Sequence, residues 1–287
     1  MSRLFERVWR VTVGTLRVDV PMRVAFEVER SVRPTPNKAT VQVWNLSRDH
    51  QAQIEQAADA QVIVEAGYVG DRGLETIFAG QLWRARGRTS GPSTIRTERS
   101  GAVDAVTHVE ARDGGAAYQQ ARVERSFGPG VSVATVLRAC ADALGVGAGN
   151  LDDVADLAEL DAGGTAYPEG TVLSGQAARE LTRILDPLGL RWSVQSGALQ
   201  VLRLGRSLRS EAVHLTPSTG LVGTPEVGPR GSVKAVSLLT PDLWPGRAVV
   251  LESARVSGRY LVRATTYRGD SHGQDWYAEC DLVPEAA

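Results

Sequence analysis

The chain has 287 residues, of which 43% are hydrophobic and 23% are charged, and its formal net charge is −1. This composition is that of a globular protein with a substantial core, and the length allows two or three small domains. The balanced charge argues against general binding to nucleic acid or to membrane surfaces, which usually requires an excess of basic residues.

The first 30 residues contain the signature of a long strand. The stretch "VDVPMRVAFEV" (18–28) alternates apolar and polar residues strictly, which predicts a half-buried strand. Pro21 has no backbone donor, so the strand is expected to lie at a sheet edge or to bend there. Residues 33–37 are predicted to form a loop, and 39–47 the next strand.

A short helix and several more strands are predicted up to residue 130. Ser47 is expected to cap a helix at 48–58, because its hydroxyl can accept a hydrogen bond from the first turn. The polar, arginine-containing stretch 86–101 is predicted to be an exposed loop or hairpin tip and a candidate contact surface. Further strands are predicted at 60–67, 75–85, 102–112 and 118–127.

The period of the apolar residues changes at residue 131, where helices are predicted. Ser132 caps a helix that ends at Gly145, and a second helix is expected to begin at Ser174. The stretch 190–204 is predicted to form a hairpin. The first helix has a single apolar stripe, made of Val133, Val136, Leu137, Cys140, Ala141 and Leu144.

The remainder of the chain is predicted to be β again, with strands at 232–239, 247–253, 259–269 and 274–283. The order is therefore a β block, a small α/β insert and a second β block. The corresponding domains are 1–130, 131–205 and 206–287.

Three functional signatures overlap in "RGDSHGQDWY" (268–277). Arg268 to Asp270 spell an integrin-binding tripeptide, but an exported protein would be needed, and no secretory signal opens the sequence. Ser271 and His272 suggest an esterase nucleophile and base, yet neighbouring side chains on a strand point to opposite faces. Gly residues on both sides of the stretch favour an exposed β-turn.

A metal site is not expected in this stretch or elsewhere. His272 and Asp275 lack a nearby third ligand, which zinc requires. The acidic run 151–161 lacks the spacing of a calcium loop, and we predict a short helix with its acidic face in solvent. Its apolar residues Leu151, Val154 and Ala158 are expected to face inward.

Cofactor and nucleophile signals are equally weak. The stretch "GVGAGN" (145–150) has neither a preceding strand nor the Lys-Ser/Thr of a phosphate loop. Cys140 and Cys280 lie on apolar stripes and are expected to be buried, without a disulfide, as in a protein made in a reducing cytoplasm. No stretch approaches 18 apolar residues, so we expect no membrane-spanning helix. We therefore assign no catalytic, cofactor-binding or metal-binding residues.

An ordered set of motifs resembles the baseplate hub proteins of Mu-like tailed phages and, more distantly, the hub part of type VI secretion spikes. The resemblance covers most of the chain. It is carried by "TPNKATVQVWNLS" (35–47), "FAGQL" (78–82), "VTHVEARDGGAAYQQARVERSFGPGVSVATVLRACADALGV" (106–146), "TGLVGTPEV" (219–227), "SLLTPDLWPGRAVVLES" (237–253) and "GRYLVRATTYRGDSHGQDWYAECDLV" (258–283).

The resemblance implies a mainly β, α+β fold with two tail-tube-like antiparallel β-barrels and a small α/β domain between them. It implies a homotrimer in which six barrels continue a sixfold tail tube and receive a threefold spike. The expected partners are a tail tube or distal tail protein, the central spike, the tape measure protein and transiently passing DNA. The expected location is the virion tail, assembled in the host cytoplasm, with spike and hydrolase activities on other polypeptides.

Two other functions remain as alternatives. One is a receptor- or glycan-binding tail-tip module, which would need an exposed aromatic platform. The other is a hydrolase that uses Ser271 and His272. The six tryptophans mostly lie within predicted strands, which disfavours a platform; they are Trp9, Trp44, Trp83, Trp192, Trp244 and Trp276.

Overall fold

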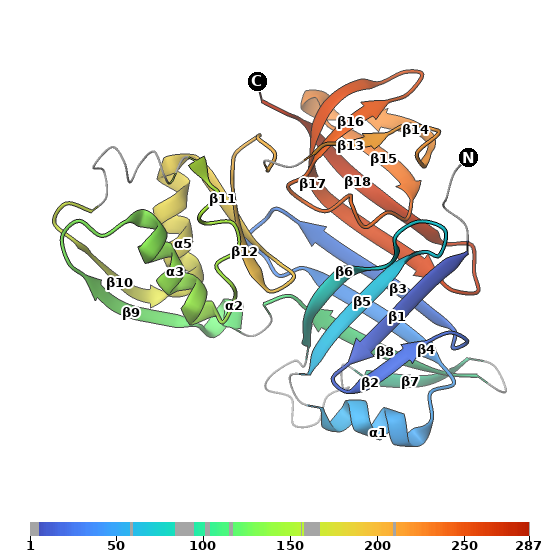
Figure 1. Cartoon of the computed structure of the whole chain (residues 1–287). Coiled ribbons are helices and arrows are strands. Elements are labelled where there is room, and N and C mark those ends of the chain that lie inside the picture. The colour runs from blue at the N-terminus through green and yellow to red at the C-terminus, as the bar shows by residue number, and fades with distance from the viewer. Residues whose placement is uncertain are drawn as a thin grey trace.

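The computed structural model consists of a large antiparallel β assembly with a smaller α/β unit beside it (Figure 1). It describes residues 6–57, 60–83, 95–100, 104–114, 117–155, 157, 167–208 and 211–286. The large assembly contains a 14-stranded sheet, and the α/β unit has two two-stranded sheets. The expectation of a mainly β chain is confirmed.

In the part that the structure describes, the N-terminal block contains eight strands and one helix before the α/β unit. They are β1 (Arg7–Val13), β2 (Leu16–Asp19), β3 (Val24–Ser31), β4 (Lys38–Trp44), α1 (Arg48–Gln56), β5 (Gln61–Tyr68), β6 (Gly73–Leu82), β7 (Ile95–Ser100) and β8 (Asp104–Arg112). Ser47 caps α1 as predicted, because its Oγ accepts a hydrogen bond from the backbone N–H of His50.

Two expectations for this block need correction. The long strand predicted at 18–28 is divided into β2 and β3, because the chain turns around Pro21 and the Met22 N–H bonds to the Asp19 carbonyl. Part of the predicted loop 86–101 is a strand, since β7 pairs with β8 from Ile95 to Ser100. Residues 84–94 and 101–103 lie outside the described residues.

The α/β unit follows the N-terminal block in the chain. Its elements are α2 (Ala117–Gln120), β9 (Arg122–Phe127), α3 (Val133–Leu144), β10 (Thr171–Gln176), α5 (Ala177–Leu185), η1 (Asp186–Leu188), β11 (Leu190–Gln195) and β12 (Ala198–Arg203). Helix α3 has the predicted Ser132 cap, and Gly145 ends it in the left-handed conformation with φ 68°. The predicted hairpin at 190–204 is confirmed by the pairing of β11 with β12.

Two segments of the unit differ from the prediction. Ser174 does not begin a helix, because it pairs with Glu124 in the β10–β9 ladder and α5 starts at Ala177. The predicted strand 118–127 begins as the helical turn α2, and only β9 is extended. Leu151 and Val154 are buried as expected, whereas Ala158 lies outside the described residues.

The C-terminal block returns to strands, and the four that were predicted are all present. The block consists of β13 (Val213–Leu215), β14 (Leu221–Val227), η2 (Pro229–Gly231), β15 (Val233–Leu238), β16 (Ala248–Glu252), β17 (Ser257–Asp270) and β18 (Trp276–Pro284). Strands β13 and β14 were not predicted, because one is only three residues long and the other contains Gly223 and Pro225.

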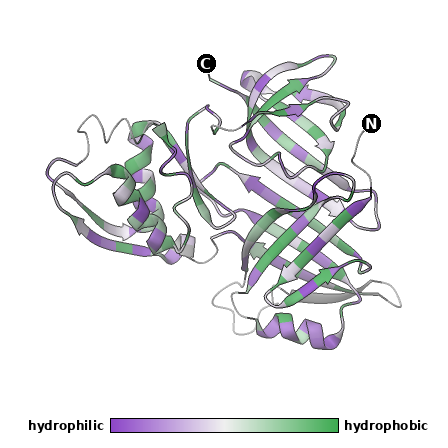
Figure 2. Cartoon of the chain, in the orientation of Figure 1, coloured by the Kyte–Doolittle hydropathy of each residue, from purple (hydrophilic) through white to green (hydrophobic). Residues whose placement is uncertain are grey.

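The two β blocks share one hydrophobic core, here called the first core, and the α/β unit has a second core. The first core draws buried residues from strands of both blocks, from Trp9 to Leu282. The second core extends from Tyr118 to Val201. Along the strands of the large assembly, hydrophobic and hydrophilic residues alternate, so one side of the sheet faces the core and the other is polar (Figure 2).

A buried polar cluster joins the α/β unit to the first β block. Arg30 is 8% exposed, and its guanidinium donates to Gln195 Oε1 and to the Ile77 carbonyl. Burial lowers the pKa of Arg30, because a charged guanidinium is disfavoured away from water. Asn37 donates to the Val194 carbonyl and to Gln195, which fixes the β11–β12 hairpin against β3 and β4.

Candidate functional site

The stretch 268–277 forms the end of β17, a turn and the start of β18. The Asp270 N–H bonds to the Asp275 carbonyl at 2.7 Å, which closes the turn. Arg7 of β1 donates to the carbonyls of Asp270, Gly273 and Gln274 and so ties the turn to the N-terminal block. The interpretation of this stretch as a turn between two strands is confirmed.

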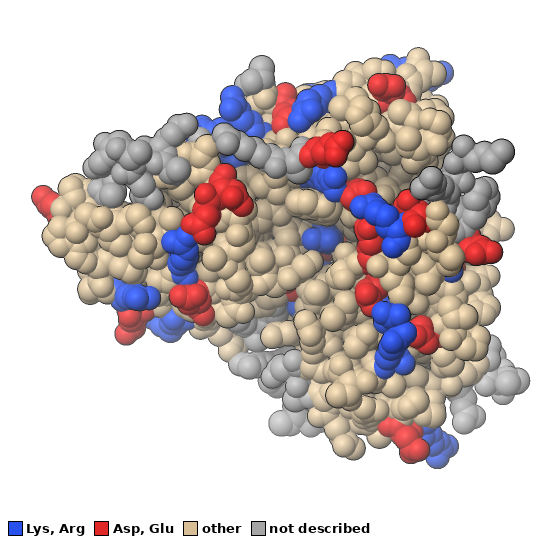
Figure 3. Space-filling view, viewed as in Figure 1, with Lys and Arg blue, Asp and Glu red and all other residues tan. Residues whose placement is uncertain are grey.

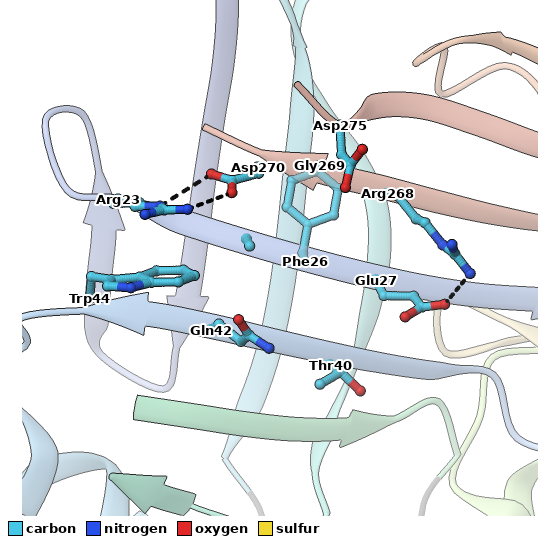
Figure 4. A pocket seen from close by; sticks show the side chains of 11 residues that line it. Arg23, Phe26, Glu27, Thr40, Gln42, Trp44, Arg268, Gly269, Asp270 and Asp275 are labelled. Atoms are coloured by element: carbon cyan, nitrogen blue, oxygen red, sulfur yellow. Dashed lines mark hydrogen bonds and ion pairs between the residues drawn. The ribbon is translucent and has the colours of Figure 1, made fainter. Parts of the chain in front are cut away.

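Arg268 and Asp270 of the integrin-like tripeptide are both engaged within the molecule. Arg268 Nη2 donates to Glu27 Oε1 at 2.9 Å, and Asp270 Oδ2 accepts from Arg23 Nη2 at 2.8 Å (Figure 4). The Asp270 side chain is only 18% exposed. The tripeptide is extended at the end of β17, but its two charged side chains are therefore not free to bind a partner.

Ser271 and His272 are closer than the sequence predicted. Ser271 Oγ lies 2.9 Å from His272 Nδ1, so the expectation that the two side chains point apart was wrong. That expectation assumed strand geometry, but both residues lie in the turn, where side chains do not alternate.

Among the described residues, the Ser271–His272 pair nevertheless lacks a third group that orients the imidazole as a base. Ser271 Oγ also accepts from the Val24 N–H at 3.0 Å, which fixes the hydroxyl against β3. Asp270 accepts from the backbone N–H of His272, and in the part of the chain that the structure describes the imidazole ring bonds to Ser271 and to no carboxylate. Within the described ranges, no group of three or more His, Cys, Asp and Glu side chains has the geometry to hold a metal ion.

The ion pair of Asp270 predicts a pH-dependent contribution to stability. Burial opposes ionisation, but the hydrogen bond from Arg23 and those from the His272 and Gly273 N–H groups outweigh it and lower the pKa of Asp270. A lowered carboxyl pKa stabilises the fold above the unfolded value of about 3.9, and this contribution is lost as the pH falls through the folded pKa.

We expect Asp270→Asn to reduce the free energy of unfolding at pH 7 by on the order of 1 kcal/mol, because the pair is partly exposed to solvent. Denaturant titrations at pH 7 and near pH 3 check this, and the difference between wild type and variant should shrink at the lower pH. A difference that stays constant between the two pH values would contradict the assignment.

The larger candidate site is the polar side of the sheet, here called the polar face. It is the side of β14, β15, β18, β17, β3, β4 and β8 that faces away from the first core. Its side chains form continuous rows across the strands. One row is Tyr277, Arg268, Glu27, Thr40 and Glu110, and a second is Val236, Glu279, Thr266, Glu29, Lys38 and Arg112.

A groove of about 440 Å³ lies at one end of the polar face. Phe26, Trp44 and Asp270 contribute to its lining, and the Arg23 guanidinium lies 4.2 Å from the centre of the Trp44 ring (Figure 4). The Arg112 guanidinium likewise lies 4.0 Å from the centre of the Trp83 ring. Trp9, Trp192 and Trp276 are buried. These five tryptophans therefore do not form the aromatic platform that a glycan-binding module needs.

Charges of both signs are interspersed on the surface, without a large patch of one sign on the visible side (Figure 3). Within the described ranges, no helix is both long and apolar enough to cross a membrane. Cys140 and Cys280 are buried as predicted, and burial raises the pKa of each thiol to about 12. Such thiols are poor nucleophiles.

No protein-family model matches the sequence, and no curated protein sequence matches it either. Solved structures do match. The 43 kDa tail protein of prophage MuSo2 from Shewanella oneidensis superposes with a TM-score of 0.61 at 10% identity, over 97% of this chain and 98% of that one. The chain has the fold of a phage tail protein.

Two further structures support this conclusion. A tail protein from Neisseria meningitidis has a TM-score of 0.61 at 10% identity, over 97% of this chain and 96% of its own. The third structure is an E. coli component of the type VI secretion system that is structurally similar to the T4 tail proteins gp27 and gp5. It has a TM-score of 0.57 at 11% identity, over 96% of this chain and 77% of that one. The resemblance inferred from the sequence motifs is confirmed for the fold, and these comparisons indicate no catalytic family.

The rows of the polar face were not identified as a site from the sequence. The signal was nevertheless present, because the polar positions of 18–28 and 39–47 alternate with the core positions. What the sequence lacked was the strand order, which brings Arg268 beside Glu27 although they are far apart in the chain.

Proposed function

We propose that this protein is a structural subunit of a phage-type tail: a trimeric baseplate or tail-tip hub. It joins a sixfold tail tube to a threefold central spike and lines the channel for the tape measure protein and DNA. The observation that carries the proposal is the match over nearly the full length of two tail proteins. The proposed location is therefore the virion tail.

We propose that each β block forms a tail-tube-like barrel, completed by a segment that bends from one side to the other. In the N-terminal block this segment consists of β2, which pairs with β1, and β3, which pairs with β4. In the C-terminal block, β13 pairs with β16, and after a short turn β14 pairs with β15. Two barrels per chain would give a trimer six similar units, which suits a sixfold tube.

The proposed domains are the two barrels and the α/β unit between them. The sequence placed the boundaries at 1–130, 131–205 and 206–287. Because β9 pairs with β10 and Tyr118 belongs to the second core, we place the first boundary at the start of α2. The linker after β12 is tied to the chain end, where Ser207 donates to Glu285 and the Ala286 N–H bonds to Gly205.

We propose that the polar face lines the channel. Its carboxylates include Glu27, Glu29 and Glu279, and its cations include Lys38 and Arg268. Mixed charges that pair with one another, such as Arg268 with Glu27, leave little net attraction for DNA phosphates. A channel wall of this kind would let DNA pass without holding it.

The solution mass of the purified chain tests the proposal. We expect light scattering to give three times the 30.7 kDa chain mass, and negative-stain images of the same sample to show rings with a central hole. A protein that stays monomeric at all soluble concentrations and also fails to join purified tails would contradict it.

A further inference from the structure

Within the chain, the two β blocks are joined by the pairing of strand β17 with strand β3, here called the joint. The second half of β17 pairs antiparallel with β3, from Ala264 opposite Ser31 to Asp270 opposite Ala25. The other edge of β17 pairs with β18. This joint makes the polar face continuous from the C-terminal block to the N-terminal block.

The runs β14-β15-β18-β17-β16 and β3-β4-β8-β6-β5 have the same pairing order, so each strand of the joint has a counterpart. β14 corresponds to β3, because each follows the bend of its block and pairs next with β15 or β4. β18 corresponds to β8, because β18 pairs with β15 as β8 pairs with β4.

The counterpart of β17 is shared between two strands. The first half of β17 corresponds to β6, because it pairs with β16 as β6 pairs with β5. The second half of β17 corresponds to β7, because β7 continues the pairing of β6 along the edge of β8 that faces away from β4.

Among the described residues, both counterparts of the joint have an open edge. Among the described strands, β14 pairs only with β15, and β7 pairs only with β8. They lie at opposite ends of the run β14-β15-β18-β17-β3-β4-β8-β7 (Figure 1). An open edge exposes unpaired backbone N–H and C=O groups that readily accept another strand.

Exposed apolar side chains accompany the open edge of β14. Val222 is 46% exposed, and its cross-strand neighbour Val236 is 37% exposed. Val227, at the end of the same strand, is 64% exposed. Pairing of another strand with this edge would bury part of the exposed Val222 side chain, which favours the contact. Pro225 and the bulge between Val222 and Glu226 interrupt the edge, which leaves the first half of β14 free to pair.

We infer that β14 of one copy pairs antiparallel with β7 of the next copy, so that the contact between chains repeats the β3–β17 joint within the chain. The occupant of the open edge is thus a second copy of this protein. Because the surfaces in contact differ, the contact is head-to-tail, and such contacts form a ring when the rotation closes. The inference rests on the proposed trimer and names its interface.

The correspondence also fixes the expected register. In the joint within the chain, the second residue of β3, Ala25, lies opposite the last residue of β17, Asp270. The same positions in the contact between chains are Val222, the second residue of β14, and Ser100, the last residue of β7. Directly opposed residues in antiparallel strands have Cα atoms about 4.5–5.5 Å apart, which is within the reach of a disulfide.

Cysteine crosslinking tests this interface. The variant Val222→Cys/Ser100→Cys is oxidised, and its mass under denaturing, non-reducing conditions is compared with that of Val69→Cys/Ser100→Cys. Val69 is 59% exposed but lies outside β14. Cys140 and Cys280 are buried, so the wild-type chain serves as a blank. Melting curves establish that each variant is folded.

We expect covalent dimers and trimers from the first variant and none from the control or the wild type. Glu98→Cys and Arg96→Cys, each combined with Val222→Cys, cover a shift of the register along β7. A folded trimer by light scattering that gives no crosslink from any of the three pairs would overturn the interface but leave the proposed function standing. A protein that remains monomeric and uncrosslinked would overturn both.

Discussion

Gly149→Ala is expected to reduce the free energy of unfolding of the α/β unit by about 2–5 kcal/mol. Gly149 has φ +62°, and a Cβ there would overlap the Leu199 carbonyl oxygen of β12. The left-handed conformation alone costs a side chain about 1–2 kcal/mol, and overpacking adds typically about 1–3 kcal/mol. The strand cannot move away easily, because Asn150 exchanges hydrogen bonds with the Val201 backbone at 2.7 and 2.8 Å.

Gly145→Ala is the matched control for this prediction. Gly145 has φ +68°, but nothing lies within 4 Å of a Cβ added there. It should therefore show only the conformational cost of about 1–2 kcal/mol. Urea denaturation followed by the fluorescence of Trp192 in the second core measures both variants. Equal losses for Gly145→Ala and Gly149→Ala would contradict the close contact between the loop and β12.

Trp276→Ala is expected to destabilise the large β assembly by about 3–5 kcal/mol, the range for removing a buried tryptophan. Trp276 is 2% exposed and makes edge-to-face contacts with Trp9 at 6.4 Å and Phe26 at 5.5 Å. The Arg7 guanidinium lies 5.4 Å from its ring centre. The side chain thus connects β18 of the C-terminal block with β1 and β3 of the N-terminal block.

Tyr277→Ala serves as the control, since Tyr277 is the next residue of β18 and belongs to the polar face. Its loss should be about 1 kcal/mol or less, as for most substitutions outside a core. Thermal unfolding of both variants provides the comparison. If Tyr277→Ala were as destabilising as Trp276→Ala, the assignment of the two sides of β18 would be wrong.

The regular elements could be predicted because local patterns determine them. Alternation of apolar and polar residues identified β18, and a hydroxyl cap with a glycine stop identified α3. Ser174 misled the prediction because serine favours helix caps, whereas the ladder with β9 decided its conformation. The break at Pro21 was foreseen as a bend, but its sharpness depends on the partners of β2 and β3.

The candidate sites were predicted less well, since they depend on contacts between distant residues. The turn at 270–275 followed from its glycines, whereas the Ser271–His272 contact required the turn geometry. The polar face required the pairing of β3 with β17, which no short motif encodes. The open edges of β14 and β7 likewise become visible only when the strand order is known.

A cryo-electron microscopy reconstruction of the purified assembly tests most directly whether this chain forms a channel wall. We expect a ring of three copies in which the polar face, with Glu27, Arg268 and Glu279, surrounds the central hole. The α/β units should lie away from that hole. A ring in which the polar face points outward, or an assembly without a central hole, would contradict the proposed role.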